Sequence, residues 1–571
     1  MTEPKNLTQS KLFIRSEVTS AIDSIKLIIN PTRNDKLKQL KRLQDISDRK
    51  SVLDILLKEL QRSKSNTVMQ IITELLMELG TIESLRDPLW CIIQSNHCSD
   101  EVKDAANIVL RQLGDATDPS VYLDYLEDPA GLINRETERM LEVSAKNPEA
   151  LIDFIDFIFS LPTDEQINLL SSLKEDYSVE HILNLILPTI LAKPPREVLE
   201  LLLPTLGETK HPRAAEFLDQ YSHWFESDAG LSKIAKTARS KLRLSGVEQD
   251  KNANEAGQHS LLVDAELFKI FATIPDGIGN MALIYSRQHT NGEIAMMSAV
   301  VSDLHGIVDC FGFYDLSQTD FYKLLEKFHE ESTKVEVSET YFLQQLESAE
   351  KLNTENKLRI PYEYSCWKMM LPKLLASRID PHAIAKALAK QEWEDATARL
   401  YHHPDVCTWF LEEGDNAIIT PVLDSVLSVC QSQLDAMAID EAGAGGSAED
   451  PDPGQVRAFV NELTTLAETL VSKLLQSQWR NTMINRLSDC AYLFKEQQTH
   501  TFSTLAATEA YKLMRHTPDE TPINGFIQHY GRRCIEEDLL RLKLDFKMSQ
   551  EPKKAALFET LVLSVLQAWE I

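Results

Sequence analysis

Apolar side chains recur at helical spacing along the N-terminal part of this 571-residue chain. Two of the apolar stripes end in the same dipeptide, Leu79-Gly80 and Leu113-Gly114, 34 residues apart. A glycine just after the last apolar position predicts a left-handed cap at the end of a helix. Because one helix pair cannot bury such a stripe alone, neighbouring pairs must stack. The pattern therefore predicts a row of paired helices.

One of these segments also carries small residues where stacked helices would approach closely. Residues 100–114 (DEVKDAANIVLRQLG) resemble the second helix of a HEAT repeat, with Ala105 and Ala106 at the close positions. Residues 198–221 repeat the pattern, with a Leu206-Gly207 ending and a proline, Pro212, at the first position of the next helix.

Residues 232–246 (SKIAKTARSKLRLSG) look like another second helix, so the likeness extends over about residues 50–245. It implies an armadillo-like α-solenoid of the HEAT-repeat superfamily, which includes the PBS-lyase-type HEAT-like repeats. The segment 150–159 (ALIDFIDFIF) is apolar nearly all round and is expected to be buried within the stack.

Residues 281–313 interrupt the helical pattern (MALIYSRQHTNGEIAMMSAVVSDLHGIVDCFGF). Three short apolar runs are separated by Asn291-Gly292 and by a second turn at 304–306. Asn-Gly favours a hairpin because both residues tolerate positive φ. The stretch predicts a three-stranded antiparallel meander, with strands at 281–287, 293–303 and 307–312.

The segments around the meander are expected to be helices. A helix is predicted at 261–274, and Ser317, Ser338 and Pro361 each mark the start of a later one. The middle strand is apolar at consecutive positions, so both faces of the sheet need cover.

The predicted fold class is mainly α: a HEAT-like α-solenoid, then a small α+β module, then a helical region. The predicted domains are a repeat domain at 1–246, a polar linker at 247–260, the α+β module at 261–371 and a C-terminal helical domain at 372–571. A flexible acidic loop is expected at 436–454 (AMAIDEAGAGGSAEDPDPG).

Charge is strongly uneven along the chain. The net charge is −28, yet residues 1–64 carry 14 Lys+Arg against 8 Asp+Glu, which leaves this end at +6. The basic end is either a solvated first repeat or a docking end for an acidic partner. The acidic remainder repels nucleic acid and anionic membranes and favours a protein partner with a basic surface. We therefore expect neither nucleic-acid nor membrane binding.

The compartment is predicted from the cysteines and from hydropathy. The eight cysteines are scattered singly, which is typical of a reducing cytoplasm. The N-terminus has no apolar signal-peptide core, and no run of about 18 apolar residues occurs. We expect a cytoplasmic protein.

The strongest candidate for a catalytic cluster consists of Asp303, His305, Asp309 and Cys310, within the meander. A Cys-His nucleophile needs the imidazole within hydrogen-bond reach of the sulfur. However, His305 lies in a tight turn, and Cys310 lies among apolar neighbours. The interpretation favoured by the sequence is therefore structural, with no catalytic residue assigned.

A second group, His402, His403, Asp405 and Cys407, has metal-ligand residue types. Only His403 and Cys407 have the i, i+4 spacing of zinc ligands, and no second pair lies nearby. Gly277-Ile278-Gly279 precedes a strand, so it does not match a phosphate-binding loop. Arg532-Arg533 is a lone basic pair. No metal or cofactor residue is assigned.

These features favour a non-catalytic scaffold or adaptor that binds proteins through its helical-repeat surface. The resemblance also implies an alternative, a HEAT-like phycobilin lyase or related tetrapyrrole-handling enzyme, although no residue matches a catalytic motif of that group. A third possibility is a regulatory protein that senses a ligand through the β module, with 247–260 as hinge.

Overall fold

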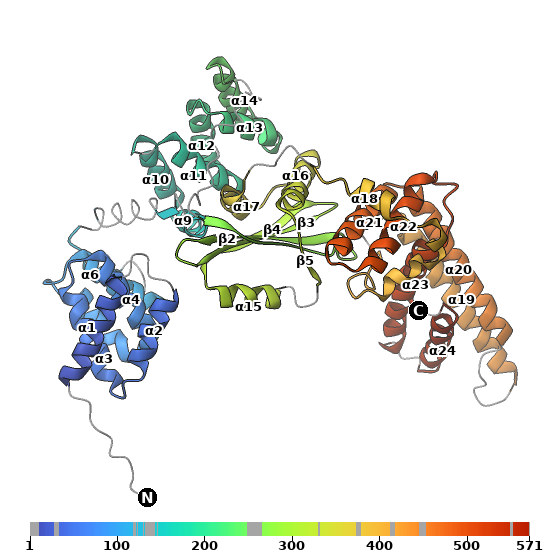
Figure 1. The fold of residues 1–571 in the computed structure, drawn as a ribbon, viewed down its shortest axis with the longest axis horizontal. Helices are drawn as coiled ribbons and strands as arrows, with labels where there is room; N and C mark the ends of the chain where they lie inside the picture. Colours follow the sequence, from blue (N-terminus) through green and yellow to red (C-terminus); the bar gives the residue numbers. More distant parts are fainter. Residues whose placement is uncertain are drawn as a thin grey trace, which may run out of the picture.

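The computed structural model describes residues 11–27, 33–117, 121–122, 124–128, 131, 143–144, 147–176, 178–247, 265–328, 332–372, 378–411, 417–444, 453–548 and 552–569. These ranges are mainly helical, with one small five-stranded antiparallel sheet (Figure 1). The expected class, helices on both sides of one β element, is confirmed at this level. The predicted linker at 247–260 lies outside the described residues except for Val247.

Six helices at the N-terminal end share one core. Their buried side chains form a cluster from Ile14 to Tyr122, separate from the core of the later helices. Alternate helices pack together: α3 contacts α1 and α5, and α4 contacts α2 and α6. The helices are α1 (Lys11–Leu27), α2 (Arg33–Gln44), α3 (Arg49–Arg62), α4 (Asn66–Leu79), α5 (Ile82–Ile93) and α6 (Asp100–Gln112).

A second set of helices precedes the sheet and packs in the same alternating way. α11 contacts α9 and α13, and α12 contacts α10 and α14. Pro212 begins α13, as its sequence position predicts. The set comprises α9 (Pro148–Ser160), α10 (Thr163–Asp176), α11 (Val179–Leu191), α12 (Arg196–Glu208), α13 (Pro212–Tyr221), the short 3₁₀ helix η1 (Ser222–Phe225) and α14 (Ala229–Leu244).

The three Leu-Gly dipeptides play different roles. Gly114 has φ +87° at the end of α6, as expected, whereas Gly80 has φ −97° and is not a left-handed cap. A Cβ at Gly80 would lie 2.1 Å from Leu85, so close packing excludes a side chain there. Gly207 lies inside α12, where an added Cβ would lie 2.8 Å from the Ala238 Cα of α14. α12 ends one residue later, at Glu208, so the predicted ending is right to within one residue, although this glycine serves helix contact.

The sheet contains the predicted meander and two further strands. Its order is β4-β3-β2-β1-β5, so β2, β3 and β4 are the three expected strands. The helix predicted at 261–274 is wrong, because residues 265–273 form β1 and pair with β2. The strands are β1 (Ala265–Thr273), β2 (Asn280–His289), β3 (Ile294–Ser302), β4 (Gly306–Leu316) and β5 (Lys334–Glu336).

The β2–β3 turn contains Asn291-Gly292, as predicted, and is shorter than the 288–292 gap left between the predicted strands. The His289 N–H donates to the Glu293 carbonyl (2.8 Å), and the Gly292 N–H donates to the His289 carbonyl (2.9 Å). Gly292 has φ +87°, whereas Asn291 is not among the positive-φ residues. Only the glycine uses the left-handed region, as in a three-residue hairpin loop.

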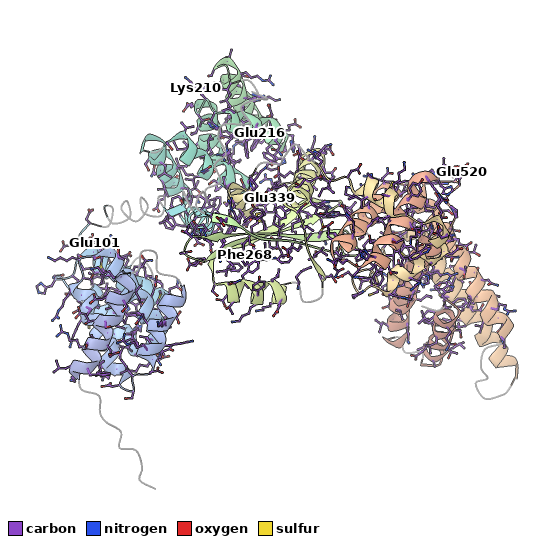
Figure 2. All side chains as sticks on the ribbon, viewed as in Figure 1. Glu101, Lys210, Glu216, Phe268, Glu339 and Glu520 are labelled. Carbon is purple, nitrogen blue, oxygen red and sulfur yellow. The ribbon has the colours of Figure 1, made fainter. Side chains whose placement is uncertain are left out.

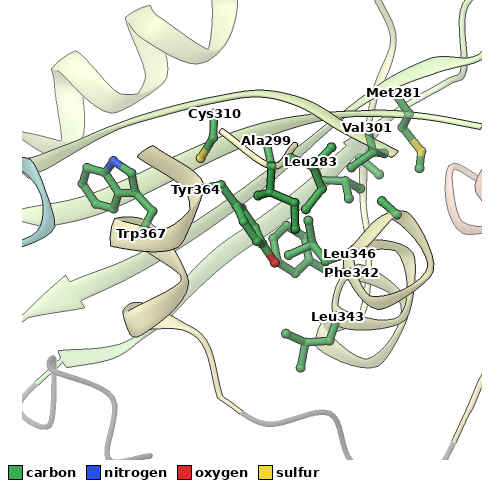
Figure 3. Close-up of a cluster of buried hydrophobic side chains, with 14 of the residues drawn as sticks. Met281, Leu283, Ala299, Val301, Cys310, Phe342, Leu343, Leu346, Tyr364 and Trp367 are labelled. Carbon is green, nitrogen blue, oxygen red and sulfur yellow. The ribbon is translucent and has the colours of Figure 1, made fainter. Parts of the chain in front are cut away.

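Helices cover both faces of the sheet, as expected. α16 (Glu339–Glu355) and α17 (Tyr362–Trp367) pack on one face, and α15 (Gln318–Phe328) packs on the other (Figure 1). Phe342, Leu346 and Trp367 meet the strands on the first face (Figure 3). The cap positions of Ser317 and Ser338 are confirmed, since each hydroxyl accepts a hydrogen bond from a first-turn N–H.

β4 forms one edge of the sheet and is joined there to the preceding helices. The Tyr314 N–H donates to the Glu149 carboxylate on α9 (2.9 Å). The Tyr362 hydroxyl of α17 donates to Asp156, which also lies on α9 (2.6 Å). The expected burial of α9 within the stack is met in part, because one face of the helix is buried whereas Asp153 and Asp156 lie on an exposed face.

The C-terminal helices form two groups: α18, α21 and α22 pack together, and α20 packs on α23. α19 continues to Ala444, so the loop predicted at 436–454 is helical in its first part. Within the described ranges, no helix combines the length and apolarity that a membrane crossing requires. The elements are α18 (Pro381–Leu388), α19 (Thr420–Ala444), α20 (Pro453–Leu475), α21 (Trp479–Glu496), α22 (His500–Arg515), α23 (Gly525–Met548), α24 (Pro552–Trp569) and the 3₁₀ helices η3 (Lys368–Met370), η4 (Gln391–Trp393) and η5 (Asp395–His402).

Candidate functional site

Cys310 is a core residue of the sheet. Its side chain is 3% exposed and lies on the side of β4 that faces Tyr364 and Trp367 of α17 (Figure 3). Burial, with help from the charge of Asp309, raises the pKa of the Cys310 thiol well above its ordinary value. A thiolate is the nucleophilic form of cysteine, so this environment disfavours nucleophilic chemistry.

His305 serves the β3–β4 turn. Its backbone N–H donates to the Ser302 hydroxyl (3.3 Å), and its carbonyl accepts from the Asn353 amide of α16 (3.1 Å). Asp309 is also locally engaged, since its carboxylate accepts from the Cys310 N–H (2.8 Å). Hydrogen bonds of the turn and the strand thus engage the backbone of His305 and the carboxylate of Asp309.

Asp303 belongs instead to a polar junction with the C-terminal helices. Arg486 of α21 donates to the Asp303 carboxylate through Nε (2.9 Å) and approaches it through Nη2 (2.8 Å). Its Nη1 donates to the Gly277 carbonyl (2.7 Å), and its guanidinium lies 5.3 Å from the Trp409 ring centre. Burial raises the pKa of Asp303 although Arg486 opposes that shift. The sequence indicated Asp303 but not Arg486, which is 183 positions away.

The glycine pair before β2 makes room for this junction. Gly279 has φ +87°, and a Cβ there would lie 2.1 Å from the Asp303 carboxylate and 2.4 Å from Arg486 Nη2. A Cβ at Gly277 would lie 2.7 Å from the Thr408 carbonyl oxygen. Close packing explains Gly277-Ile278-Gly279 without a phosphate ligand.

Asp489 extends the junction to α16. Its carboxylate accepts hydrogen bonds from the Tyr341 hydroxyl (3.2 Å) and the Gln345 amide (2.8 Å). Burial raises the pKa of Asp489 to about 7, although both hydrogen bonds oppose the shift. The sheet module and α21 are therefore joined by two carboxylates and one guanidinium.

The second predicted group is divided between surface and core. His402 is exposed, whereas His403 is buried against the rings of Phe494 (4.7 Å) and Phe502 (4.9 Å). Burial lowers the pKa of His403. Asp405 lies 3.4 Å from His403 Nδ1 and accepts from the Thr333 N–H (3.0 Å). The Cys407 thiol donates to the Pro404 carbonyl (3.0 Å).

No set of three or more His, Cys, Asp or Glu side chains is arranged to hold a metal in the part of the chain that the structure describes. The basic pair is also engaged by the fold. Arg532 lies over the Trp569 ring (5.9 Å), and Arg533 pairs with Glu536 and Glu537. These arginines stabilise the C-terminal helices.

α1 carries a groove on its surface at the basic end of the chain. A shallow groove of about 620 Å³ follows this helix, and Leu12 at its start is 81% exposed. Arg15 and Asp23 supply its charges. The remaining lining residues are the small hydroxyl side chains Ser16, Thr19, Ser20 and Ser24.

No family model matches this sequence, and neither a curated protein nor a solved structure shows significant similarity to it.

Proposed function

We propose that this chain is a non-catalytic scaffold or adaptor that binds partner proteins through its helical surfaces. The observation that carries the proposal is the engagement of its reactive residue types by the fold. Cys310 is a core thiol, Asp303 is held by Arg486, and His403 packs among aromatic rings. These groups stabilise contacts between elements, so we expect the function to depend on partner binding by the exposed helical surfaces.

We also propose that both helical sets before the sheet are HEAT-like. The support is their alternating contacts, in which each helix packs on the helix two positions along, in α1–α6 and again in α9–α14. Such rows of paired helices expose long surfaces to partners. The close approach of α12 and α14 at Gly207 and Ala238 also fits this architecture.

Charge supports two kinds of partner surface. The N-terminal helices have many exposed cations, among them Lys38, Lys41 and Lys58, beside the groove-bearing helix α1. We propose that they dock an acidic protein segment. Acidic side chains gather instead around α9 and α17, where burial and neighbouring carboxylates raise the pKa of Glu149, Asp153 and Glu363. A basic partner surface would relieve that repulsion.

The cytoplasm is the compartment that we propose for this activity. All eight cysteines are free, including the exposed Cys91. A reducing compartment is where unpaired cysteines usually persist.

Affinity capture with the full-length protein tests the scaffold. We expect the same partner to be recovered repeatedly at low salt, and to be lost from a Lys38→Glu/Lys41→Glu variant if it docks on the basic end. A Lys351→Glu variant, changed on the exposed surface of α16, is the matched control. Recovery of no specific protein at low salt would contradict the proposal, and a thiol-dependent activity lost in Cys310→Ser would replace it with an enzymatic one.

A further inference from the structure

Three buried nitrogen atoms without an acceptor lie around the Trp224 ring, where η1 meets the loop that follows α16. Trp224 Nε1, His223 Nε2 and Arg359 Nη1 have no hydrogen-bond partner among the described residues. The Arg359 guanidinium carbon lies 5.2 Å from the centre of the Trp224 indole, and the His223 ring lies 5.8 Å from it. Side chains from two distant parts of the sequence therefore meet at one indole.

Charged groups of both signs surround this indole: Arg359 lies over the ring and Lys357 acts on His223, whereas Glu226 acts on His223 and Glu216 and Glu350 act on Tyr221. Arg359 makes no ion pair with any residue in the described ranges, and burial lowers the pKa of its guanidinium. Burial and the nearby charge of Lys357 lower the pKa of His223, whereas Glu226 and a hydrogen bond that the imidazole donates to the Gln220 backbone carbonyl oppose this shift. Arg359 thus differs from Arg486, whose charge is matched by Asp303.

A negatively charged acceptor is what this arrangement lacks. Buried polar groups are normally hydrogen-bonded, and a buried charge without a partner is costly. Guanidinium and indole groups can only donate, and a protonated imidazole donates from both nitrogens. A ligand that satisfies all three must therefore be an acceptor, and charge-assisted bonds to an oxyanion are the strongest of that kind.

The surrounding contacts hold the donors in place. The Tyr221 ring packs against Trp224 with ring centres 4.3 Å apart. The Gln220 amide donates to the Thr354 hydroxyl near the end of α16 (2.8 Å). These contacts fix α13 and η1 against α16, so the three side chains are positioned before any ligand arrives.

We propose that Trp224, His223 and Arg359 bind a small oxyanion, a carboxylate or phosphate group, at the junction between α13–η1 and α16. The bound anion pairs with the Arg359 guanidinium and accepts from the indole N–H. It also favours the imidazolium form of His223, so binding takes up a proton. This site goes beyond the proposed scaffold and does not depend on it.

Titration calorimetry of the full-length protein, first with inorganic phosphate and separately with acetate, tests the site and distinguishes the two anions. We expect one site per chain, bound more tightly as pH falls from about 8 to 6 because His223 is then protonated more readily. Arg359→Met keeps an apolar stem over Trp224 and should weaken binding at least tenfold. Arg378→Met, which removes an exposed guanidinium paired with Glu347, should leave the affinity unchanged.

Two further variants keep the test decisive. Trp224→Phe retains an aromatic ring without the indole N–H and should also weaken binding. This variant provides the test if Arg359→Met does not fold. His223→Gln should remove the pH dependence. Without anion, Arg359→Met should melt no lower than the natural protein, because an unpaired buried charge has been removed. Phosphate should raise the melting temperature only of proteins that retain Arg359.

Absence of binding by either anion would overturn the proposal, as would unchanged affinity in both Arg359→Met and Trp224→Phe. The three donors would then be satisfied by water alone. A fall in the melting temperature of Arg359→Met, with no anion dependence in the natural protein, would assign Arg359 a purely structural role.

Discussion

The Asp303–Arg486 junction gives the sharpest test of the structure. Arg486 makes hydrogen bonds to Asp303 and to the Gly277 carbonyl and lies over Trp409. Arg486→Gln removes the charge and leaves the Asp303 carboxylate in a largely buried site. Breaking a buried ion pair by removing one partner typically costs about 3–5 kcal/mol. We expect a loss in this range at the junction between the sheet and α21.

Hydrogen exchange read by mass spectrometry measures this loss locally, which matters because a chain of several units need not unfold in one step. At roughly 1.4 kcal/mol per tenfold change, the cost corresponds to on the order of 10²–10⁴-fold faster exchange. The increase should appear in peptides that contain Gly277–Asn280 and Arg486. It should be smaller at acidic pH, because protonation of Asp303 removes the unpaired charge.

The matched control is Arg378→Gln, which removes an exposed ion pair with Glu347 and should cost about 0–1 kcal/mol. Asp303→Asn together with Arg486→Gln should recover part of the loss, since no charge is then left unpaired. If Arg486→Gln exchanged like the Arg378 control, the junction would not join the sheet to α21, and the reasoning would be wrong.

Three other perturbations follow from the same structure. Asp489 has a folded pKa of about 7 against an ordinary 3.8, so its contribution to stability falls as pH rises from about 4 through 7. Asp489→Asn should flatten the melting temperature between about pH 4 and 7, and an unchanged profile would contradict the assignment. Gly207→Val places a side chain against the Ala238 backbone and should destabilise the α12–α14 contact by about 1–3 kcal/mol in denaturant titrations, whereas a neutral effect would show that the helices can separate freely. Cys310 should resist alkylation in the native protein while the exposed Cys91 reacts, as peptide mapping would reveal; equal labelling would refute the core assignment.

The sequence predicted the elements whose signals are local. The meander at 281–313, the caps at Ser317 and Ser338 and the start of α13 at Pro212 depend on turn residues and nearby side chains, so they could be recognised. The strand at 265–273 could not, because its Leu, Phe and Ile residues fit either period and the pairing with β2 decides the outcome.

The junctions were missed for a different physical reason. Asp303 and Arg486 are 183 positions apart, and no periodic pattern relates them. The indole of Trp224 and the guanidinium of Arg359 likewise meet only after α13 has packed on α16. Polar contacts between distant elements depend on the tertiary arrangement, which one sequence does not specify by spacing.

The hydrogen bond from Tyr314 to Glu149 also bears on self-association. An edge strand exposes backbone groups that can recruit a strand from another molecule. In β4 a carboxylate from α9 occupies the position that an incoming strand's carbonyl would take, and its negative charge discourages an approaching acidic copy. Glu149 therefore closes the sheet against extension at Tyr314 while it anchors the preceding helices to that edge.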